Sequence, residues 1–544
     1  MARETLSLME DEVKLEVIRL NQENCSSRFI SSYTGISKTA INDFLAKKSF
    51  KDFWESYEDK PIASGELSSP ETHHKKLEGK RFLITSAQNN TYVFRNGFET
   101  LKRFCEHNDA ELIVGTFTYN KNGFQNLNKE ADGIWYDPYV IPYINNSSCE
   151  LTDGLIFFGE LNILPTAVDP LSGLENYSKS SSGIVPHAKL QLKSCPRPKY
   201  DDPKFLYTTG TITKRNYIQQ KSGQKAGFHH VYSALIVEID SDGEWFVRQF
   251  VLDENGHAYD LDKLYTPTDV YDQQRVESIT FGDVHVEKLD RGVYEASIED
   301  KDSMVKSLKP KNIFIHDLID FSAKNHHNIN DPDHLYQTFI SGNDSVEVEM
   351  EIAANFLENL LDKSPLDSKI LVVESNHHQA LNNWLKTADY RNDPVNAVYF
   401  LELQLQKYKS MREGLDIDLF EQAIKPRMSH GLEDEIIFLR EDESYTICDE
   451  DGKGIECSYH GHRGIGGARG SIESFVRMNS RLNVGHSHTA SIKDGVYVAG
   501  HMTDVRLMTY AKGPSTWSHS HIVTYPNGKR SIFTIKNGKY KANK

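Results

Sequence analysis

Six short apolar runs in the second half of the chain have the length and composition of buried β-strands. In chain order, between residues 276 and 485, they are VESITFG, NIFIH, KILVVE, DEIIFLR, GIECSYH and RLNVG. Apolar residues at helical spacing lie between them, most clearly over residues 346–361. Strands that alternate with helices are typical of an α/β fold. The final stretch instead predicts antiparallel strands that turn at Asn527-Gly528 and Asn537-Gly538.

The same pattern divides the chain into three segments. Residues 81–268 begin with a strand (RFLITSA), a helix (GFETLKRFCEHN) and a strand (ELIVGTF), and later become rich in strands, with a hairpin turning at Ser241-Asp242-Gly243. Residues 1–60 are helical, and a Pro-, Gly- and Ser-rich stretch over 61–80 follows them. We therefore expect a helical domain over 1–60, a mixed α/β accessory domain over 81–268 and an α/β domain over 271–544. No internal repeat is visible in the sequence.

Composition narrows the class of protein. The 544 residues carry a net charge of −16 and a mean hydropathy of −0.54, and no apolar run approaches the about 18 residues that a membrane span needs. Six cysteines are scattered without a C-x-x-C pair, which favours a reducing cytoplasm over a disulfide framework or a thiolate zinc site. The acidic balance argues against a general nucleic-acid coat, so contacts with phosphate need local basic patches or metal ions.

Residues of metal-binding type follow five of the six apolar runs. These are Asp283 and His285, Asp317 and Asp320, Asn376 and His377, His460 and His462, and His486 and His488. Because ligands gather outside the carboxyl ends of strands in an α/β sheet, we expect these side chains to converge. Carboxylates mixed with an amide and imidazoles suit Mn²⁺, Fe or Zn²⁺ better than Mg²⁺. One shared carboxylate can bridge two cations about 3.5–4 Å apart.

The order D-x-H, D-x-x-D, N-H, H-x-H and G-H-x-H resembles that of the calcineurin-like metallophosphoesterase superfamily over about residues 276–540. The resemblance implies a metallophosphoesterase-type βαβ sandwich that hydrolyses phosphate esters. It also implies the following roles: Asp283, His285 and His488 hold one metal, Asn376, His460 and His486 hold the other, and Asp317 bridges both. His377 would lie beside the phosphate, where it would stabilise charge in the transition state or protonate the leaving oxygen. Asp320 would orient ligands.

Several positions depart from the family pattern or leave alternatives open. His316 stands where the family usually has glycine, and Ser375 and His378 replace a glycine and an acidic residue, which points to a divergent branch. His462 could replace His460 as a ligand, but the apolar strand stops at His460. In the run HGHRGIGGARGS, backbone N–H groups with Arg463 or Arg469 could cradle a phosphodiester; the alternative is a flexible loop with solvated arginines. The pairs His229-His230 and His326-His327 are more simply explained as surface or satisfied polar residues, and His519 and His521 as one face of a strand. His187 has no obvious partner in the sequence.

Two regions have features suited to DNA. The stretch FISSYTGISKTAINDFL resembles a helix-turn-helix, with a turn at Gly35 and with Ser37, Lys38, Thr39 and Asn42 near the start of a recognition helix. The alternative is a helical hairpin used for docking. Residues 187–225, which include Lys214 and Arg215, hold nine Lys and Arg against two Asp, interleaved with aromatic residues. Such a segment suits a surface that guides a nucleic-acid strand, or it is a solvated pair of loops.

The overall layout resembles the pre-early first-step-transfer proteins of large tailed coliphages, which degrade host DNA. This resemblance implies manganese-dependent DNA cleavage in the cytoplasm of an infected bacterium, and assembly into a homo-oligomer. We therefore expect a two-metal phosphodiesterase that acts on DNA, with Mn²⁺ as the favoured ion and Fe, Zn²⁺ or Mg²⁺ as alternatives. Two other hypotheses are a metallophosphoesterase acting on nucleotides or another small phosphate ester, and a non-catalytic DNA-binding regulator.

Overall fold

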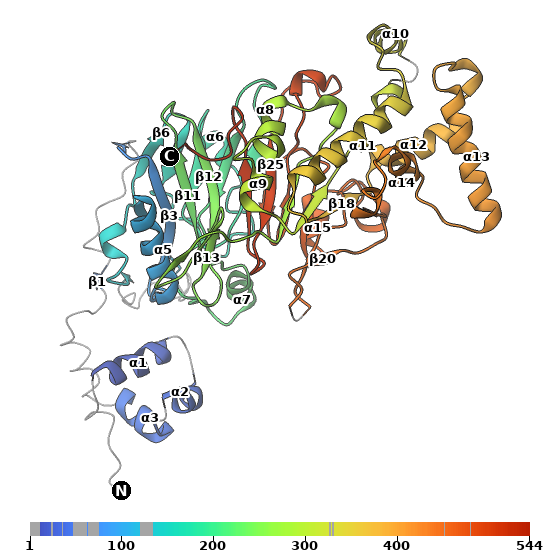
Figure 1. Cartoon of the computed structure of the whole chain (residues 1–544). Helices are drawn as coiled ribbons and strands as arrows, with labels where there is room; N and C mark the ends of the chain where they lie inside the picture. The colour runs from blue at the N-terminus through green and yellow to red at the C-terminus, as the bar shows by residue number, and fades with distance from the viewer. Residues whose placement is uncertain are drawn as a thin grey trace.

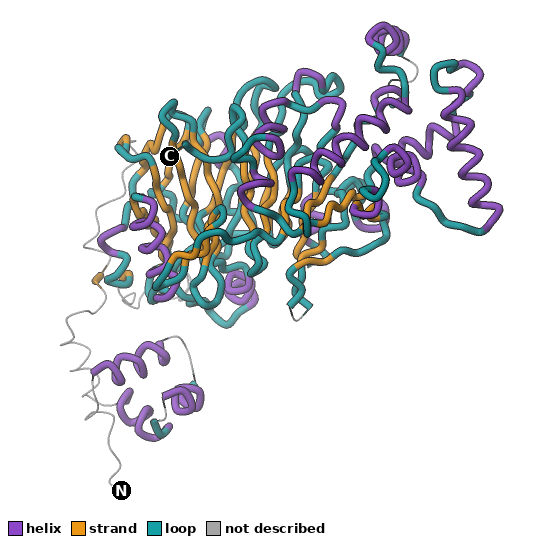
Figure 2. Tube along the Cα trace, viewed as in Figure 1, coloured by secondary structure: helices purple, strands orange, loops and turns teal. Residues whose placement is uncertain are grey.

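The computed structural model of the chain describes residues 11–22, 26–34, 36–46, 62–63, 75–119, 134–325, 328, 331–450, 452–478 and 480–543. Gly35, His326, His327 and most of the stretch 61–80 lie outside these residues. The described part is a mixed α/β protein in which a band of strands is flanked by helices (Figures 1 and 2). No helix within it combines the length and the apolarity that crossing a membrane requires.

The N-terminal segment contains three short helices, α1 (Asp11–Gln22), α2 (Ser27–Thr34) and α3 (Lys38–Ala46). Their apolar faces meet in a small core of Val17, Ile18, Leu20, Ile30, Ile36, Ile41 and Phe44. Ser37 caps α3, because its hydroxyl accepts a hydrogen bond from the Ala40 N–H at 3.2 Å. The helices therefore begin and end close to the positions that the apolar spacing predicts.

The last segment forms a six-stranded sheet with the order β19-β18-β17-β16-β25-β26. Its strands are β16 (Ser278–Thr280), β17 (Asn312–Ile315), β18 (Lys369–Val373), β19 (Ile436–Leu439), β25 (Ser520–Thr524) and β26 (Arg530–Thr534). The first four are parallel, and the hairpin β25–β26 continues the sheet antiparallel to β16. The predicted strands and the turn at Asn527-Gly528 are confirmed.

The middle segment forms a four-stranded sheet with the order β12-β11-β3-β4. Its strands are β3 (Arg81–Gln88), β4 (Glu111–Phe117), β11 (Ser233–Ile239) and β12 (Trp245–Val251). Helix α5 (Arg95–Asn108) connects the parallel strands β3 and β4, as the sequence predicts. Strand β12 lies beside β26 of the six-stranded sheet, where the Gln249 N–H donates to Ser531 Oγ and the Ile532 N–H donates to Gln249 Oε1.

A second layer is an eleven-stranded sheet to which both segments contribute. In spatial order its strands are β2 (Lys75–Lys76), β6 (Ser148–Thr152), β7 (Leu155–Phe158), β8 (Ser182–Val185), β10 (Lys204–Thr208), β9 (Leu192–Cys195), β23 (Ser491–Lys493), β24 (Val496–Val498), β22 (Arg481–Val484), β21 (Ile455–Glu456) and β20 (Thr446–Ile447). The seam between the segments is the antiparallel pair β9–β23, with Lys193 opposite Ser491. The boundary expected near residue 270 therefore separates two stretches of chain that share one sheet.

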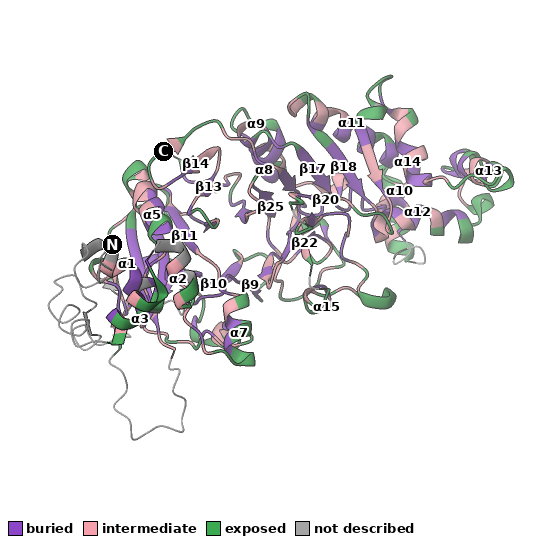
Figure 3. Cartoon of the chain, turned by 90° about the horizontal axis from the view of Figure 1, so that it is seen from below, coloured by how far each residue is buried: buried purple, intermediate pink, exposed green. Residues whose placement is uncertain are grey.

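The core lies between the two layers, because each sheet turns an apolar face inward. Ile522 and Ile532 of the six-stranded sheet share a cluster with Phe205 and Ile492 of the eleven-stranded sheet and with Val237 of the four-stranded sheet. Helices cover the outer faces of the sandwich. They are α6 (Leu174–Tyr177), α8 (Arg291–Tyr294), α9 (Met304–Leu308), α11 (Val346–Lys363), α12 (Asn376–Thr387), α14 (Leu419–Ile424) and α15 (Ile472–Val476), together with α5. Figure 3 shows this buried band, with exposed surface on the outlying helices α10 (Pro332–Ser341) and α13 (Ala397–Glu413).

The middle and last segments repeat one strand topology, which the sequence did not reveal. In chain order, β3, β4, β6, β7, β8, β9, β10, β11 and β12 correspond to β16, β17, β20, β21, β22, β23, β24, β25 and β26. Every pairing within the first set, parallel or antiparallel, has its counterpart in the second. The last segment adds β18, β19 and the helices around them. Within the chain, the sandwich is thus built from two similar halves that meet at β9–β23 and β12–β26.

Smaller elements connect these parts. A two-stranded sheet pairs β1 (Ile62–Ala63) with β5 (Trp135–Tyr136). A three-stranded sheet consists of β13 (Ala258–Asp260), β14 (Lys263–Tyr265) and β15 (Val270–Tyr271). The short helix α7 (Lys221–Phe228) precedes the hairpin β11–β12.

Candidate metal centre

The strand ends of the last half converge on one place, as the pattern predicts. Asp283 and His285 follow β16, Asp317 follows β17, and His460 follows β21. Asn376 is the first residue of α12, directly after β18, and His486 and His488 follow β22. The structure brings the carboxylate and imidazole groups together in overlapping clusters that could hold metal ions.

One cluster consists of Asp283, His285, Asp317 and His488, all of them buried. His488 Nε2 lies 3.0 Å from Asp283 Oδ2 and 3.3 Å from His285 Nε2. His285 Nε2 also lies 3.6 Å from Asp317 Oδ2. These four residues are the predicted ligands of the first metal together with the predicted bridge.

A second cluster consists of Asp317, His460 and His486, and it shares Asp317 with the first. His460 Nε2 lies 3.2 Å from Asp317 Oδ2, and the rings of His460 and His486 are 5.1 Å apart. Asn376 lines the same cavity as Asp317 and His486. Two predicted ligands of the second metal, His460 and His486, therefore lie beside Asp317, and the third, Asn376, lines the adjoining cavity.

Several buried polar atoms of these clusters have no hydrogen-bond partner within the described part of the chain. They include Asp317 Oδ1, Asn376 Oδ1, His285 Nδ1 and His488 Nδ1. Leaving a buried polar atom unsatisfied costs about 1–3 kcal/mol, so such a concentration needs an explanation. Oxygen and imidazole lone pairs that converge in this way fit divalent cations.

The backbone supports the same interpretation. His285, Asp317, His486 and His488 all have left-handed backbone conformations, with φ between 42° and 69°. A residue other than glycine in this conformation lowers the stability of the fold by about 1–3 kcal/mol, and such strained residues concentrate at functional sites. Gly485 is needed for space, because a Cβ there would lie 2.3 Å from Asp283 Oδ1.

Asp320 lies beside one of the candidate ligands, His285. Its Oδ1 lies 3.5 Å from His285 Nδ1, and Lys288 Nζ binds its Oδ2 at 2.5 Å. A proton held at His285 Nδ1 leaves the Nε2 lone pair to face His488 and Asp317. Burial lowers the pKa of His285 to about 4, so the ring is neutral near pH 7 and its lone pair is available.

His377 is part of neither of these two clusters, but it forms a third metal-type cluster with His285 and Asp320. Its Nδ1 donates a hydrogen bond to the Asp320 carbonyl at 2.8 Å, and its ring lines the cavity that opens onto Asp317. Burial lowers the pKa of His377, but the carboxylates of Asp317 and Asp320 outweigh that effect and raise it. A protonated imidazole in this place can donate a proton to a bound ester.

The departures from the family pattern have structural roles. The hydroxyl of Ser375 accepts from the His378 N–H and caps α12, while His378 Nε2 accepts from the Leu318 N–H just after Asp317. His316 is buried with its Nδ1 3.4 Å from His460 Nδ1. His460 contacts Asp317, whereas His462 Nε2 lies 3.4 Å from Glu441 Oε1, so the geometry favours His460 as a ligand.

The clusters open into a cavity of about 670 Å³. Arg469 lines it, together with Tyr510 and Trp517, and the rings of Trp517 and His488 lie 4.3 Å apart. Arg463, the other predicted arginine, points elsewhere: it binds Glu441 Oε1 at 2.8 Å and Gln379 Oε1 at 3.0 Å. The two arginines of the glycine-rich loop therefore face different surfaces.

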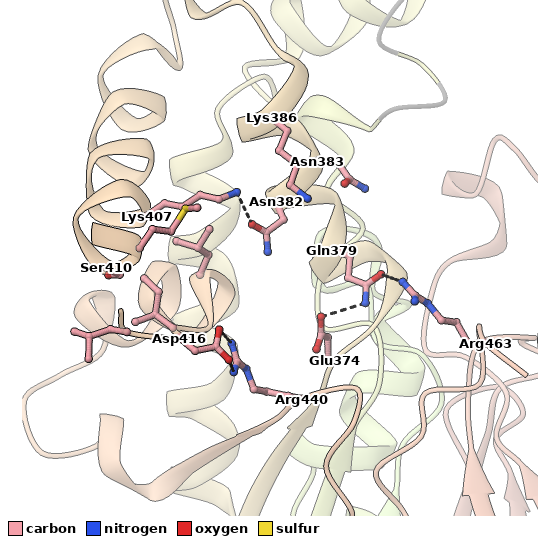
Figure 4. Close-up of a pocket in the computed structure, with 14 residues that line it drawn as sticks. Glu374, Gln379, Asn382, Asn383, Lys386, Lys407, Ser410, Asp416, Arg440 and Arg463 are labelled. Atoms are coloured by element: carbon pink, nitrogen blue, oxygen red, sulfur yellow. Dashed lines mark hydrogen bonds and ion pairs between the residues drawn. The ribbon is translucent and has the colours of Figure 1, made fainter. Parts of the chain in front are cut away.

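Arg463 lies at the end of a polar groove along α12 and α13 (Figure 4). Carboxamides of Gln379, Asn382 and Asn383 line this groove, with the cations Lys386, Lys407 and Arg440 and the acids Glu374 and Asp416. Its volume is about 490 Å³. Helix α12, which begins at Asn376, therefore runs from the metal-type clusters along this polar groove.

Comparison with known proteins gives one strong relationship. The chain is 40% identical over 494 residues to Protein A1 of Escherichia phage T5, which corresponds to 89% of this chain and 86% of that protein. The chain belongs to the family of Protein A1. No protein-family model and no solved structure matches it. The relationship connects the chain to a phage protein.

In this member of the A1 family, the predicted basic segment is arranged differently from expectation. Phe205, Tyr207 and Tyr217 are buried in the core, so the prediction that they interleave with basic groups on a surface is wrong; Tyr200 is exposed. Arg215 donates to the Gly227 and His230 carbonyls, and Lys214 beside it is half-buried.

The sequence of this A1 relative also did not indicate Tyr510 and Trp517, which line the cavity at the candidate centre. They lie in an irregular loop between β24 and β25, where neither periodicity nor a motif distinguishes them. The candidate DNA contacts Ser37, Lys38, Thr39 and Asn42 are exposed, as a recognition helix requires. Asn42 Oδ1 accepts a hydrogen bond from Ser27 Oγ at 2.6 Å, which links α3 to α2.

Proposed function

We propose that the chain is a two-metal phosphodiesterase that hydrolyses DNA, with a calcineurin-like metallophosphoesterase fold in its last half. The observation that carries this proposal is the pair of ligand clusters that share Asp317 at the carboxyl end of parallel strands. Asp283, His285 and His488 would hold one cation, and Asn376, His460 and His486 the other. When bound, the cations would neutralise phosphate charge and activate water for attack on phosphorus.

The side chains of the chain itself supply binding and proton transfer. Asp320, which Lys288 binds, lies 3.5 Å from His285 Nδ1 and would orient the ring when a metal is bound. His377 carries a proton at Nδ1 toward the Asp320 carbonyl and presents Nε2 to the cavity, where it can stabilise a developing oxyanion or protonate the leaving oxygen. Arg469 lies where it can bind a non-reacting phosphate oxygen.

Two features favour DNA over a small ester. A polar groove that includes Lys386, Lys407 and Arg463 lies beside the cavity at the centre. The cavity and the groove together offer a larger binding surface than a single nucleotide would occupy. Three short helices precede the sandwich, with an exposed polar face at the start of α3 that suits the major groove. The donor set, which mixes carboxylates with imidazoles, suits Mn²⁺, Fe or Zn²⁺. Among these ions, Mn²⁺ is preferred in this proposal because of the resemblance to the first-step-transfer proteins.

Metal-dependent digestion tests the proposal. Purified protein with Mn²⁺ should degrade linear or circular DNA, and Asp317→Ala should abolish this while the thermal unfolding of the metal-free protein remains cooperative. Bis-p-nitrophenyl phosphate and mononucleotides serve as small substrates in the same assay. Hydrolysis of the small substrates with intact DNA would instead identify a small-ester phosphatase, and DNA binding without any hydrolysis would identify a regulator.

A further inference from the structure

The middle half of the sandwich has a strand edge that corresponds to the metal centre of the last half. Strand β8 pairs with β7 through Ser182 and Leu155, just as β22 pairs with β21 through Arg481 and Ile455. Counting onward from Ser182 and Arg481, Pro186-His187-Ala188-Lys189 occupies the place of Gly485-His486-Ser487-His488. The two halves therefore match residue by residue at this edge.

Within the part of the chain that the structure describes, the middle edge does not repeat the metal-type clusters. The same register places Glu160 after β7 where His460 follows β21. His187 matches His486 but is committed to the backbone: its Nε2 donates to the Leu164 carbonyl and its Nδ1 accepts from the Lys189 N–H. Among the described residues, the metal-type clusters all belong to the last half.

Positive charge occupies this edge instead. Lys189, at the position of His488, lines a cavity of about 580 Å³ together with Lys221, Ser222 and Lys225 of α7. Lys189 is 6% exposed and donates from Nζ to the Val168 carbonyl, which uses one of its three protons. Lys221 and Lys225 are exposed, and neither forms an ion pair within the described residues.

One acidic residue, Asp494 from the hairpin β23–β24, also lines the cavity. It lies 3.0 Å from His229 Nδ1, and this contact lowers its pKa against the effect of burial. Three ammonium groups thus face one carboxylate that already has a partner. The net charge of the cavity lining is positive, although the whole chain carries −16.

We propose that this lysine cavity binds a backbone phosphate of DNA. Its ammonium groups would neutralise phosphate charge in the middle half, as metal cations would in the last half. This inference rests on the proposed function, because it assigns the middle half to holding the same substrate. Lysine–phosphate contacts carry no base specificity and add affinity that falls with salt. The middle half would then share the strand topology of the catalytic half and bind DNA without hydrolysing it.

The double charge reversal Lys221→Glu/Lys225→Glu tests the inference in the full-length chain. Binding of a fluorescent DNA duplex is measured by anisotropy without divalent metal, and hydrolysis of bis-p-nitrophenyl phosphate is measured with Mn²⁺. We expect at least about a tenfold weaker DNA affinity, and a salt dependence reduced by about two ions. Hydrolysis of the small diester should be unchanged, which also shows that the variant is folded.

Lys102→Glu/Arg103→Glu on α5 is the control, because it makes the same change of charge away from the cavity. It also breaks ion pairs with Glu99 and Glu106, so cooperative thermal unfolding of this variant is checked as well. It should bind DNA within about twofold of the unsubstituted chain. If the lysine variant binds as tightly as the unsubstituted chain, or no more weakly than the control, the inference is wrong while DNA cleavage stands. If the unsubstituted chain neither binds nor cleaves DNA, the inference and the proposed function fall together.

Discussion

Gly485→Ala is a sharp test of the metal centre, because it adds one methyl group against one candidate ligand. A Cβ at this position would lie 2.3 Å from Asp283 Oδ1 and 3.0 Å from the His316 ring. Real contacts of this kind are not shorter than 3.0 Å, so Asp283 must retreat by at least 0.7 Å (3.0 − 2.3). The φ of Gly485 is not in the left-handed region, so the substitution adds no backbone strain.

The displacement moves a group that is fixed on both sides. Asp283 Oδ1 accepts from the His486 N–H at 3.0 Å, and Oδ2 lies 3.0 Å from His488 Nε2. A misplacement of about 1 Å in a catalytic constellation costs about 100-fold in rate, or roughly 2.8 kcal/mol. Disturbed ligand positioning weakens metal binding by about 10–100-fold.

The assay is hydrolysis of bis-p-nitrophenyl phosphate as a function of Mn²⁺ concentration, which separates the metal midpoint from kcat. We expect the midpoint to rise about tenfold or more and kcat to fall about 100-fold. Gly227→Ala in α7 is the control, since its Cβ would make an ordinary 3.5 Å contact with Tyr217. A Gly485→Ala protein whose metal midpoint and kcat stay within about twofold of the original would refute the placement of Asp283 at the centre.

Four further predictions concern single residues. Asp317→Asn should abolish hydrolysis and also the stabilisation by Mn²⁺, which is about 2.7 kcal/mol at 100 times Kd and is read as a thermal shift; a full shift in this variant would contradict the shared ligand. His377→Gln should lower kcat about 100-fold or more but keep the thermal shift, because the residue moves protons and binds no metal. Lys288→Met should leave Asp320 without its ion-pair partner and weaken Mn²⁺ binding about tenfold, measured by titration calorimetry. An unchanged Mn²⁺ affinity would contradict the role of Lys288 and Asp320 in orienting His285. Burial lowers the pKa of His230 from 6.5 to about 3, so below pH 6.5 the unfolded chain binds a proton that the folded chain does not. The free energy of unfolding therefore falls with pH below 6.5, by about 2 kcal/mol at pH 5 from this residue alone. In His230→Gln, the dependence of the urea-denaturation free energy on pH should lose the contribution of up to one proton, and an unchanged slope would exclude this cause.

The strands of the last half could be predicted from the sequence because their signals are local. Each run of buried residues ends where polar residues begin, and the parallel order then places Asp283, Asp317 and His460 at one edge. Whether they bind metal stays a prediction, since the structure supplies only the convergence. The choice between His460 and His462 needed coordinates, because both follow the same strand.

The duplicated topology could not be predicted, because it consists of pairings between residues far apart in the chain. Lys193 and Ser491 are opposite each other in one sheet although nearly the whole last half lies between them. The aromatic residues Phe205 and Tyr207 illustrate the same limit: their basic neighbours suggested a surface, but strand β10 is buried on both faces. Local composition does not report which layer will cover a strand.

The seam β9–β23 has a consequence for dissecting the protein into parts. A fragment that begins near residue 270 would lose the partner of β23 and the neighbour of β26, and both strands would become open sheet edges. Unprotected edges pair with other chains, so this fragment should aggregate even though it contains the complete set of candidate ligands. Co-expression of residues 75–268 as a separate polypeptide would restore the missing neighbours, and recovery of soluble material from the pair alone would show that each half acts as the other's folding partner.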